Sequence, residues 1–224
     1  MIIWLASYPR SGNTFFRILL NHLYAIKTPT VYIGFDGVAV AVGEELVGHV
    51  TEEPSVEEMA SSSETFIVKT HKREDAPHPT IYLVRDGRDS LVSYARSRAD
   101  ETNTYEHVLR ELITTSASAT GTWGQNVCHW LNQDMGNTIY VRYEDLIQHP
   151  EEIVEQTLLR LNHPLASQKI NQQTPTFADL QTINSTFFRR GIVGSYKDEM
   201  PEDLHALFWA QPDHVEAMQR LGYQ

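Results

Sequence analysis

The chain begins with the apolar run IIWLA at residues 2–6, and the polar turn SYPRSGNT follows at residues 7–14. The β-branched and aromatic residues of the run predict a short buried strand. Apolar residues then recur at helical spacing between residues 15 and 26, which predicts an amphipathic helix. A strand, a polar turn and a helix N-terminus bring unpaired amides and the positive end of the helix dipole together. The unit predicts an anion-binding loop, although an ordinary capped strand-to-helix turn has the same pattern.

The side chains of this turn suit a phosphate-like group without matching a standard ATP loop. Arg10 offers a fixed positive charge and a fork of donors, and Ser11 and Thr14 offer hydroxyls. A Walker A motif has Gly, four residues, then Gly-Lys-Ser/Thr. Aligning Gly12 and Thr14 with it leaves Asn13 where the lysine should be. A nucleotide kinase would therefore lack the lysine that reaches the transferred phosphate.

The composition indicates one globular domain spanning residues 1–224. Of the 224 residues 41% are apolar and 21% are charged, which is typical of a folded domain. The formal net charge of −11 disfavours general binding to nucleic acid or to an anionic membrane. Cys128 is the single cysteine, which excludes an internal disulfide and fits a reducing compartment. No apolar stretch is long enough to span a bilayer, so we expect no membrane span and a cytoplasmic location.

Strand and helix patterns alternate along the chain. Further strands are expected at residues 65–71, 80–84 and 137–143. Residues 162–185 look polar and irregular, and residues 201–221 look like one closing helix. This alternation predicts an α/β fold of three layers, α/β/α, around a central parallel sheet. Ligands of such sheets bind beyond the carboxyl ends of the strands, where the polar residues that follow the strands, Arg10, His71, Arg85 and Tyr143, would lie.

Two further basic turns follow the first. Arg85 and Arg88 stand at the end of the strand at 80–84, with Ser93 on the helix that follows, and Arg189-Arg190 precedes Gly191. The alternative is that these arginines pair with nearby acids or form a solvated basic turn. In a chain of net charge −11, three basic turns suggest a ligand with more than one anionic group.

His71, at a predicted strand end, is the best candidate for a general base. An unperturbed imidazole titrates near neutral pH, which suits proton abstraction. A structural hydrogen-bonding role is the alternative, because the chain has ten histidines. We find no metal-ligand spacing and no Gly-x-Ser-x-Gly nucleophile elbow, so no metal site is expected.

Together these segments resemble the sulfotransferases that use 3′-phosphoadenosine 5′-phosphosulfate (PAPS). Residues 8–15 (YPRSGNTF) look like their 5′-phosphosulfate loop. Residues 85–94 (RDGRDSLVSY) resemble their 3′-phosphate motif, and residues 188–194 (FRRGIVG) resemble the late Arg-Lys-Gly loop. Residues 69–71 (KTH) match the segment with the catalytic histidine of the cytosolic branch. Tyr143 and Phe177 match residues that contact adenine.

The resemblance implies a P-loop NTPase-like fold and in-line sulfuryl transfer from PAPS to a hydroxyl or amine of a small-molecule or glycan acceptor, without a metal. His71 and Arg10 would be catalytic. The residues that would bind PAPS are Arg10, Ser11, Gly12, Asn13, Thr14, Phe15, Arg85, Ser93, Tyr143, Phe177, Arg189, Arg190 and Gly191. The family's loop lysine, loop tryptophan and late lysine are replaced by Arg10, Phe15 and Arg190. Two alternatives remain: a P-loop small-molecule kinase that uses ATP with Mg²⁺, and a non-catalytic nucleotide-binding protein.

Overall fold

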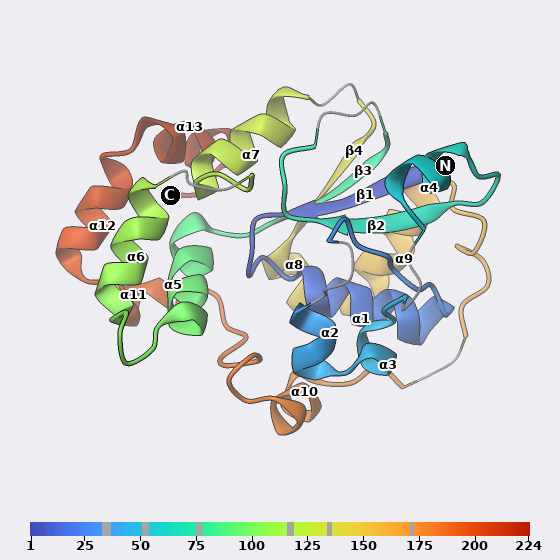
Figure 1. Cartoon of the computed structure of the whole chain (residues 1–224), viewed down its shortest axis with the longest axis horizontal. Helices are drawn as coiled ribbons and strands as arrows, with labels where there is room; N and C mark the ends of the chain where they lie inside the picture. Colours follow the sequence, from blue (N-terminus) through green and yellow to red (C-terminus); the bar gives the residue numbers. More distant parts are fainter. Residues whose placement is uncertain (33–36, 51–53, 75–77, 116–118, 134–135, 171–172) are drawn as a thin grey trace.

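The computed structural model describes residues 1–32, 37–50, 54–74, 78–115, 119–133, 136–170 and 173–224 (Figure 1). Its centre is a parallel sheet with the strand order β2-β1-β3-β4. The strands are β1 (Ile2–Ser7), β2 (Phe66–Thr70), β3 (Thr80–Val84) and β4 (Thr138–Arg142). All three neighbouring pairs are parallel. The predicted α/β class with a central parallel sheet is therefore confirmed.

The helices precede, connect and follow these strands. Their bounds are α1 (Asn13–Tyr24), α2 (Gly37–Val42), α3 (Glu44–Val47), α4 (Val56–Ser61), α5 (Gly87–Arg98), α6 (Tyr105–Thr114), α7 (Trp123–Asn132), α8 (Tyr143–Gln148), α9 (Pro150–Arg160), α10 (Phe177–Ile183), α11 (Tyr196–Glu199), α12 (Glu202–Trp209) and α13 (Pro212–Leu221). Among the described residues no helix is both long and apolar enough to cross a membrane.

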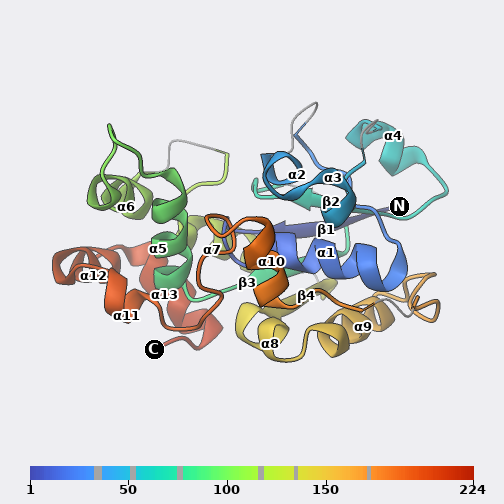
Figure 2. The same cartoon turned by 90° about the horizontal axis from the view of Figure 1, so that it is seen from below.

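Successive residues of each strand pack alternately into two separate hydrophobic cores. This explains the near-continuous apolar runs in the strand sequences. Ile3 and Leu5 of β1 pack with α1, α8 and α9, whereas Trp4 and Ala6 pack with α5, α6, α7, α12 and α13. Figures 1 and 2 show these two helix groups on opposite sides of the sheet. A sheet buried on both faces has no polar face, so its sequence shows apolar runs rather than alternation. The predicted three layers are confirmed.

The strand register brings the carboxyl ends of the strands to one edge. Ala6 pairs with Thr70, Ser7 pairs with Leu83, and Val84 pairs with Arg142. The chain runs from β1 outward to β2 and then returns to β3 on the other side of β1, so the topology switches direction between β1 and β3. In open parallel sheets a crevice opens at such a point. The loops that follow the strands therefore converge there.

The structure corrects two expectations about the C-terminal third. The segment 162–185, expected to be irregular, contains α10, which begins with a capping box between Thr176 and Asp179. The single helix expected at 201–221 is two helices, because Pro212 begins α13 and cannot donate a backbone hydrogen bond to the preceding turn. The segment 143–148 after β4 is also helical, as α8.

The junction of α7 and α13 contains a buried histidine. The His214 ring is fully buried, and its Nδ1 accepts a hydrogen bond of 3.2 Å from the backbone N–H of Gly124. An added Cβ at Gly124 would lie 2.4 Å from the backbone carbon of Asp213, so only glycine allows this approach. Burial lowers the pKa of His214 to about 4, and the nearby carboxylate of Asp213 offsets part of this effect.

We expect this histidine to make the protein less stable in acid. An unfolded histidine titrates near pH 6.5. Between about pH 6.5 and 4 the unfolded chain therefore binds a proton that the folded chain does not, and stability is lost as the pH falls through this window, by at most about 3 kcal/mol. Urea unfolding of wild type and His214→Asn across this range measures the effect. The variant should show the shallower pH dependence, and equal slopes would refute the assignment.

Candidate active site

The loop between β1 and α1 has two residues in the left-handed region. Arg10 has φ 67° and Gly12 has φ 96°. Left-handed backbone is strained for a non-glycine residue, and such strain is concentrated at functional sites. A Cβ on Gly12 would approach the Tyr143 ring to 3.0 Å, so the glycine also lets this ring pack against the loop. The turn is thus built tightly around the N-terminus of α1.

Two side chains of this loop point into the fold and hold its shape. The Asn13 amide donates to the carbonyl of Leu5 and to Ser7 Oγ, each at 3.2 Å. The Ser11 hydroxyl is buried and lies 3.3 Å from that of Ser90. Asn13 therefore ties the helix start to β1 at the place where a Walker loop has its lysine. Any ligand contact from Ser11 would come from its backbone.

A cavity of about 1100 Å³ lies at this edge of the sheet. It is larger than the ~300–1,000 Å³ of common ligand sites, so it has room for two substrates. Of the residues predicted to form the site, all but Ser11 line it: Arg10, Gly12, Asn13, Thr14, Phe15, His71, Arg85, Ser93, Tyr143, Phe177, Arg189, Arg190 and Gly191. Among the described residues no aspartate or glutamate lines it. The cavity is therefore strongly cationic within an acidic chain.

His71 is held in place from three sides. Its Nδ1 lies 2.9 Å from the carbonyl oxygen of Ser7, which can only accept, so Nδ1 carries the proton. This hydrogen bond fixes the tautomer and places the ring lone pair on Nε2. The backbone N–H of His71 donates to the Tyr32 hydroxyl at 3.0 Å, and its carbonyl accepts from the Asn126 amide at 3.1 Å. The ring is thus oriented as a base at the cavity wall.

Arg10 reaches across the cavity to the late loop. Its Nε donates to Ser93 Oγ at 3.1 Å, and a terminal nitrogen donates to the carbonyl of Phe187. The guanidinium also stacks 4.5 Å from the Phe187 ring centroid. Burial and, to a smaller extent, the nearby positive charge of Arg85 lower the pKa of Arg10 to about 10. Arg10 stays protonated at neutral pH, in a place where an anion would relieve this repulsion.

Arg85 holds an unsatisfied buried donor. Its two terminal nitrogens donate to the carbonyls of Arg10 at 3.2 Å and Ile192 at 3.0 Å. Its guanidinium lies 4.2 Å from the ring centroid of Tyr143, and the residue is only 6% exposed. Its Nε has no hydrogen-bond partner among the described residues. A buried donor of this kind is costly unless a ligand or water accepts from it.

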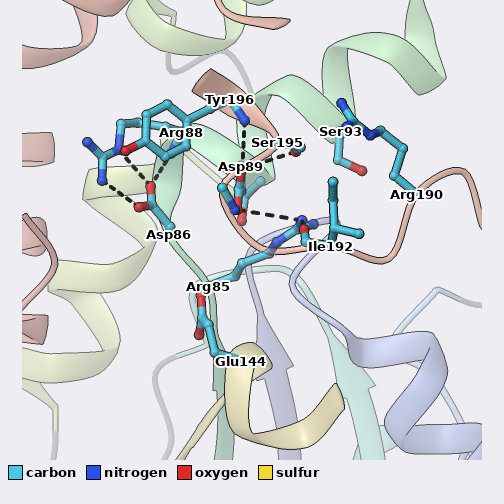
Figure 3. Close-up of polar contacts among 12 residues, drawn as sticks. Arg85, Asp86, Arg88, Asp89, Ser93, Glu144, Arg190, Ile192, Ser195 and Tyr196 are labelled. Atoms are coloured by element: carbon cyan, nitrogen blue, oxygen red, sulfur yellow. Dashed lines mark hydrogen bonds and ion pairs between the residues drawn. The ribbon is translucent and has the colours of Figure 1, made fainter. Parts of the chain in front are cut away.

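The buried carboxylate of Asp89 anchors the late loop to α5 (Figure 3). It accepts from the Gly194 amide at 2.7 Å, the Tyr196 amide at 2.9 Å and the Ser195 hydroxyl at 3.1 Å. It also lies 3.8 Å from an Arg85 nitrogen. Asp89 thereby links the turn after β3 to a segment more than 100 residues away in the chain.

Arg189 and Arg190 share one carboxylate. Both donate to Glu199 Oε1, at 2.8 and 2.9 Å, and Arg96 lies 3.2 Å from Oε2. Burial alone would raise the pKa of Glu199, but the arginine hydrogen bonds outweigh it and lower the pKa. Gly191, with φ 62°, leaves room for the Phe177 ring, because an added Cβ would lie 2.4 Å from that ring. The late loop thus carries two oriented cations and a neighbouring aromatic face.

Several supporting residues were missed from the sequence. Tyr32 and Asn126 hold the backbone of His71, and Glu199 orients the late arginines. Tyr32 and Asn126 carry no local signal, since they approach His71 only through tertiary packing. Asp89, by contrast, stands within the quoted run RDGRD, and a second acid in a basic turn is a usable sign of an internal anchor.

We expect Asp89→Ala to destabilise the protein by about 3–5 kcal/mol, because it leaves two amides without their acceptor and Arg85 without its nearby buried negative charge. Urea unfolding measures the change. Asp203→Ala is the matched control: its carboxylate pairs with Arg110 but is 65% exposed, so the loss should stay below about 1 kcal/mol. Similar losses in the two variants would contradict the anchoring role.

Comparison with known proteins agrees with the resemblance read from the sequence. A model of the sulfotransferase domain family matches residues 2–220. Sulfotransferase 1B1 from Mus musculus is 24% identical, over 88% of this chain and 76% of that protein. Sulfotransferase 1 family member D1 from Rattus norvegicus is 23% identical, over 97% of this chain and 83% of the relative.

Solved structures show the same fold. The mouse sulfotransferase SULT7A1 complexed with PAP superposes with a TM-score of 0.65 at 17% identity, covering 97% of this chain and 84% of that one. Retinol dehydratase, in complex with androsterone and the inactive cofactor PAP, also has a TM-score of 0.65 at 17% identity, covering 97% and 80% of the two chains. Both the fold and the family expected from the sequence are confirmed, and this chain belongs to the sulfotransferase family.

Proposed function

We propose that this sulfotransferase moves the sulfuryl group of PAPS to a hydroxyl or amine of a small-molecule acceptor and releases adenosine 3′,5′-bisphosphate (PAP). The observation that carries the proposal is the meeting of His71 with Arg10, Arg85 and the late arginines in one cavity free of described carboxylates. The structural relatives named above were solved with PAP, which supports the same nucleotide here.

The turn after β3 and the late loop suit the 3′-phosphate. Arg85 supplies the buried Nε that lacks an acceptor among the described residues, and Ser93 on α5 supplies a hydroxyl that already accepts from Arg10. Arg189 and Arg190 add two charges, which Glu199 already orients. Arginine forks bind phosphate oxygens well because their donors are planar and fixed. The aromatic side chains of Phe15, Tyr143 and Phe177 supply apolar walls for the adenine.

The β1–α1 loop suits the sulfated 5′ end. The backbone amides at the N-terminus of α1 and the Thr14 hydroxyl are donors, and Arg10 of the same loop adds a positive charge that it keeps at neutral pH. In sulfuryl transfer, negative charge grows on the oxygen that bridges phosphorus and sulfur as its bond to sulfur breaks. Donors that are already in place stabilise that charge without reorganisation. Arg10 and the loop amides take this role.

His71 completes the reaction at the other side of the transferred group. With Nδ1 protonated and donating to the Ser7 carbonyl, Nε2 accepts the proton of the acceptor hydroxyl. The acceptor oxygen forms its bond to sulfur while the sulfur–oxygen bond to the phosphate breaks, and PAP leaves with the bonding electrons. The imidazolium that results is stabilised by the Ser7 carbonyl. Turnover of labelled PAPS with a panel of phenols, sterols, sugars and peptides tests the proposal.

Family membership favours this function over the kinase alternative. The kinase reading needs a loop lysine, and here Asn13 occupies that position and is used to hold the loop. Thermal shift separates the two directly: PAP should raise the melting temperature more than ATP with Mg²⁺ does. A non-catalytic nucleotide-binding protein would bind PAP but release no labelled sulfate product.

His71→Ala should lower turnover to background while PAP still binds, because the ring contacts the transferred proton and not the nucleotide clamp. Initial rates with labelled PAPS and calorimetric titration with PAP measure the two effects. The control is His107→Ala on the exposed face of α6, which should keep wild-type rates. Full activity of His71→Ala would rule out the assignment of His71 as the base.

Arg85→Ala should weaken PAP binding about 10–100-fold, since it removes charge-assisted hydrogen bonds to a buried phosphate. Calorimetry of the variant against wild type gives the ratio of Kd values. Arg110→Ala, which removes an exposed guanidinium on α6, is the matched control and should bind PAP normally. An unchanged Kd for Arg85→Ala would count against the 3′-phosphate site.

A further inference from the structure

The cavity continues past His71 into a part that the nucleotide clamp does not use, here called the acceptor end. It comprises Val31, Tyr32, Lys69, Lys72, Tyr94, Ser97 and Arg98. Tyr32 ties this part to the catalytic histidine, because its hydroxyl accepts from the His71 backbone and its ring lies 6.5 Å from the imidazole. The acceptor must lie here if His71 is to reach its hydroxyl.

The acceptor end contains three cations outside the proposed nucleotide clamp: Lys69, Lys72 and Arg98. Lys69 is buried, with its ammonium 4.8 Å from the Tyr32 ring. The Lys72 ammonium lies 5.5 Å from the Tyr32 ring, beside His71 in the chain. Arg98, the last residue of α5, lies 5.4 Å from the ring of Tyr94. Neither Lys72 nor Arg98 has a carboxylate within ion-pair distance among the described residues. Arg96 on the same helix, by contrast, pairs with Glu199 at 3.2 Å.

This distribution of charge is unusual for the chain. Its 29 acidic residues outnumber its 18 lysines and arginines, and several arginines outside the acceptor end pair with a carboxylate, among them Arg88, Arg96 and Arg110. Yet no described acid lines the cavity. Cations grouped in a concave site with low-dielectric walls raise the local concentration of anions. The remaining wall of the acceptor end is apolar and consists of Val31 and the two tyrosine rings.

We propose that the acceptor is a hydroxylated organic anion: an apolar body, a hydroxyl presented to His71, and an anionic group drawn to Lys72 and Arg98. The proposal rests on the sulfotransferase function proposed above and narrows its acceptor class. Lys72 is half-buried and Arg98 is exposed. A charged hydrogen bond to the less exposed Lys72 corresponds to about tenfold in affinity, and the exposed Arg98 adds less.

The test uses the whole protein saturated with PAP and three hydroxy acids, one phenolic, one steroidal and one aliphatic, each beside its methyl ester. Calorimetry gives Kd, and initial rates with PAPS give kcat/KM. At least one acid should bind about tenfold or more tightly than its ester, and raised salt should reduce this ratio. Phenolic phosphonate and phenolic sulfonate analogues are titrated in the same way. Their Kd values show whether the site prefers a carboxylate or another anionic group.

Lys72→Gln combined with Arg98→Gln should lower the acid-to-ester ratio about tenfold or more. Lys27→Gln combined with Arg160→Gln is the matched control: both side chains are exposed outside the cavity, Arg160 also ends a helix, and the net charge changes equally. The control should keep the wild-type ratio.

Three results would overturn the proposal: esters that bind as well as every acid, a preference that survives in Lys72→Gln/Arg98→Gln, or no acid binding at millimolar concentration. Failure of PAP itself to bind would instead contradict the sulfotransferase function, so the two failures can be told apart.

Discussion

The whole site depends on holding like charges close together. Half-buried Arg10 lies near buried Arg85, and their mutual repulsion contributes to the lowered pKa of Arg10. A folded protein sustains such an arrangement only if other contacts fix each guanidinium. Here the fixing groups are mostly backbone carbonyls: Phe187 accepts from Arg10, and Ile192 accepts from Arg85. Carbonyls carry no full charge, so they orient the cations without neutralising them, and Asp89, 3.8 Å from Arg85, is the nearby carboxylate. One carboxylate beside two guanidinium groups leaves the site with an attraction for anions.

The carboxylates of Asp89 and Glu199 support the site without lining the cavity. Asp89 is fully buried and holds the late loop through two amides and a hydroxyl, while Glu199 holds Arg189 and Arg190. Both acids act on the far side of the groups that would meet a ligand. The arrangement gives rigid cations and a cavity lined, in its described part, by no acid. Pre-oriented donors lose little entropy when a phosphate arrives, which favours tight nucleotide binding.

The sequence predicted the sheet edge well and the supporting contacts poorly, for physical reasons. Apolar runs identify strands that are buried on both faces, and parallel strands bring their carboxyl ends together. The sequence alone therefore predicts that Arg10, His71 and Arg85 lie at one edge of the sheet. α10 is a short helix in a polar segment, and its capping box at Thr176 was overlooked. Contacts such as that of Asn126 with His71 arise only once α7 packs on the sheet.

The acceptor class is harder to predict from the sequence than the nucleotide is. The groups assigned to PAPS follow strand ends or lie in one late loop, and their order along the chain is a signal in itself. The acceptor end draws on a loop before α2, the residue after His71 and the last turn of α5. No motif joins these pieces, and only their placement around one cavity shows that Lys72 and Arg98 share it. Lys72 and Arg98, which have no carboxylate at ion-pair distance among the described residues, are then the remaining clue to the charge of the acceptor.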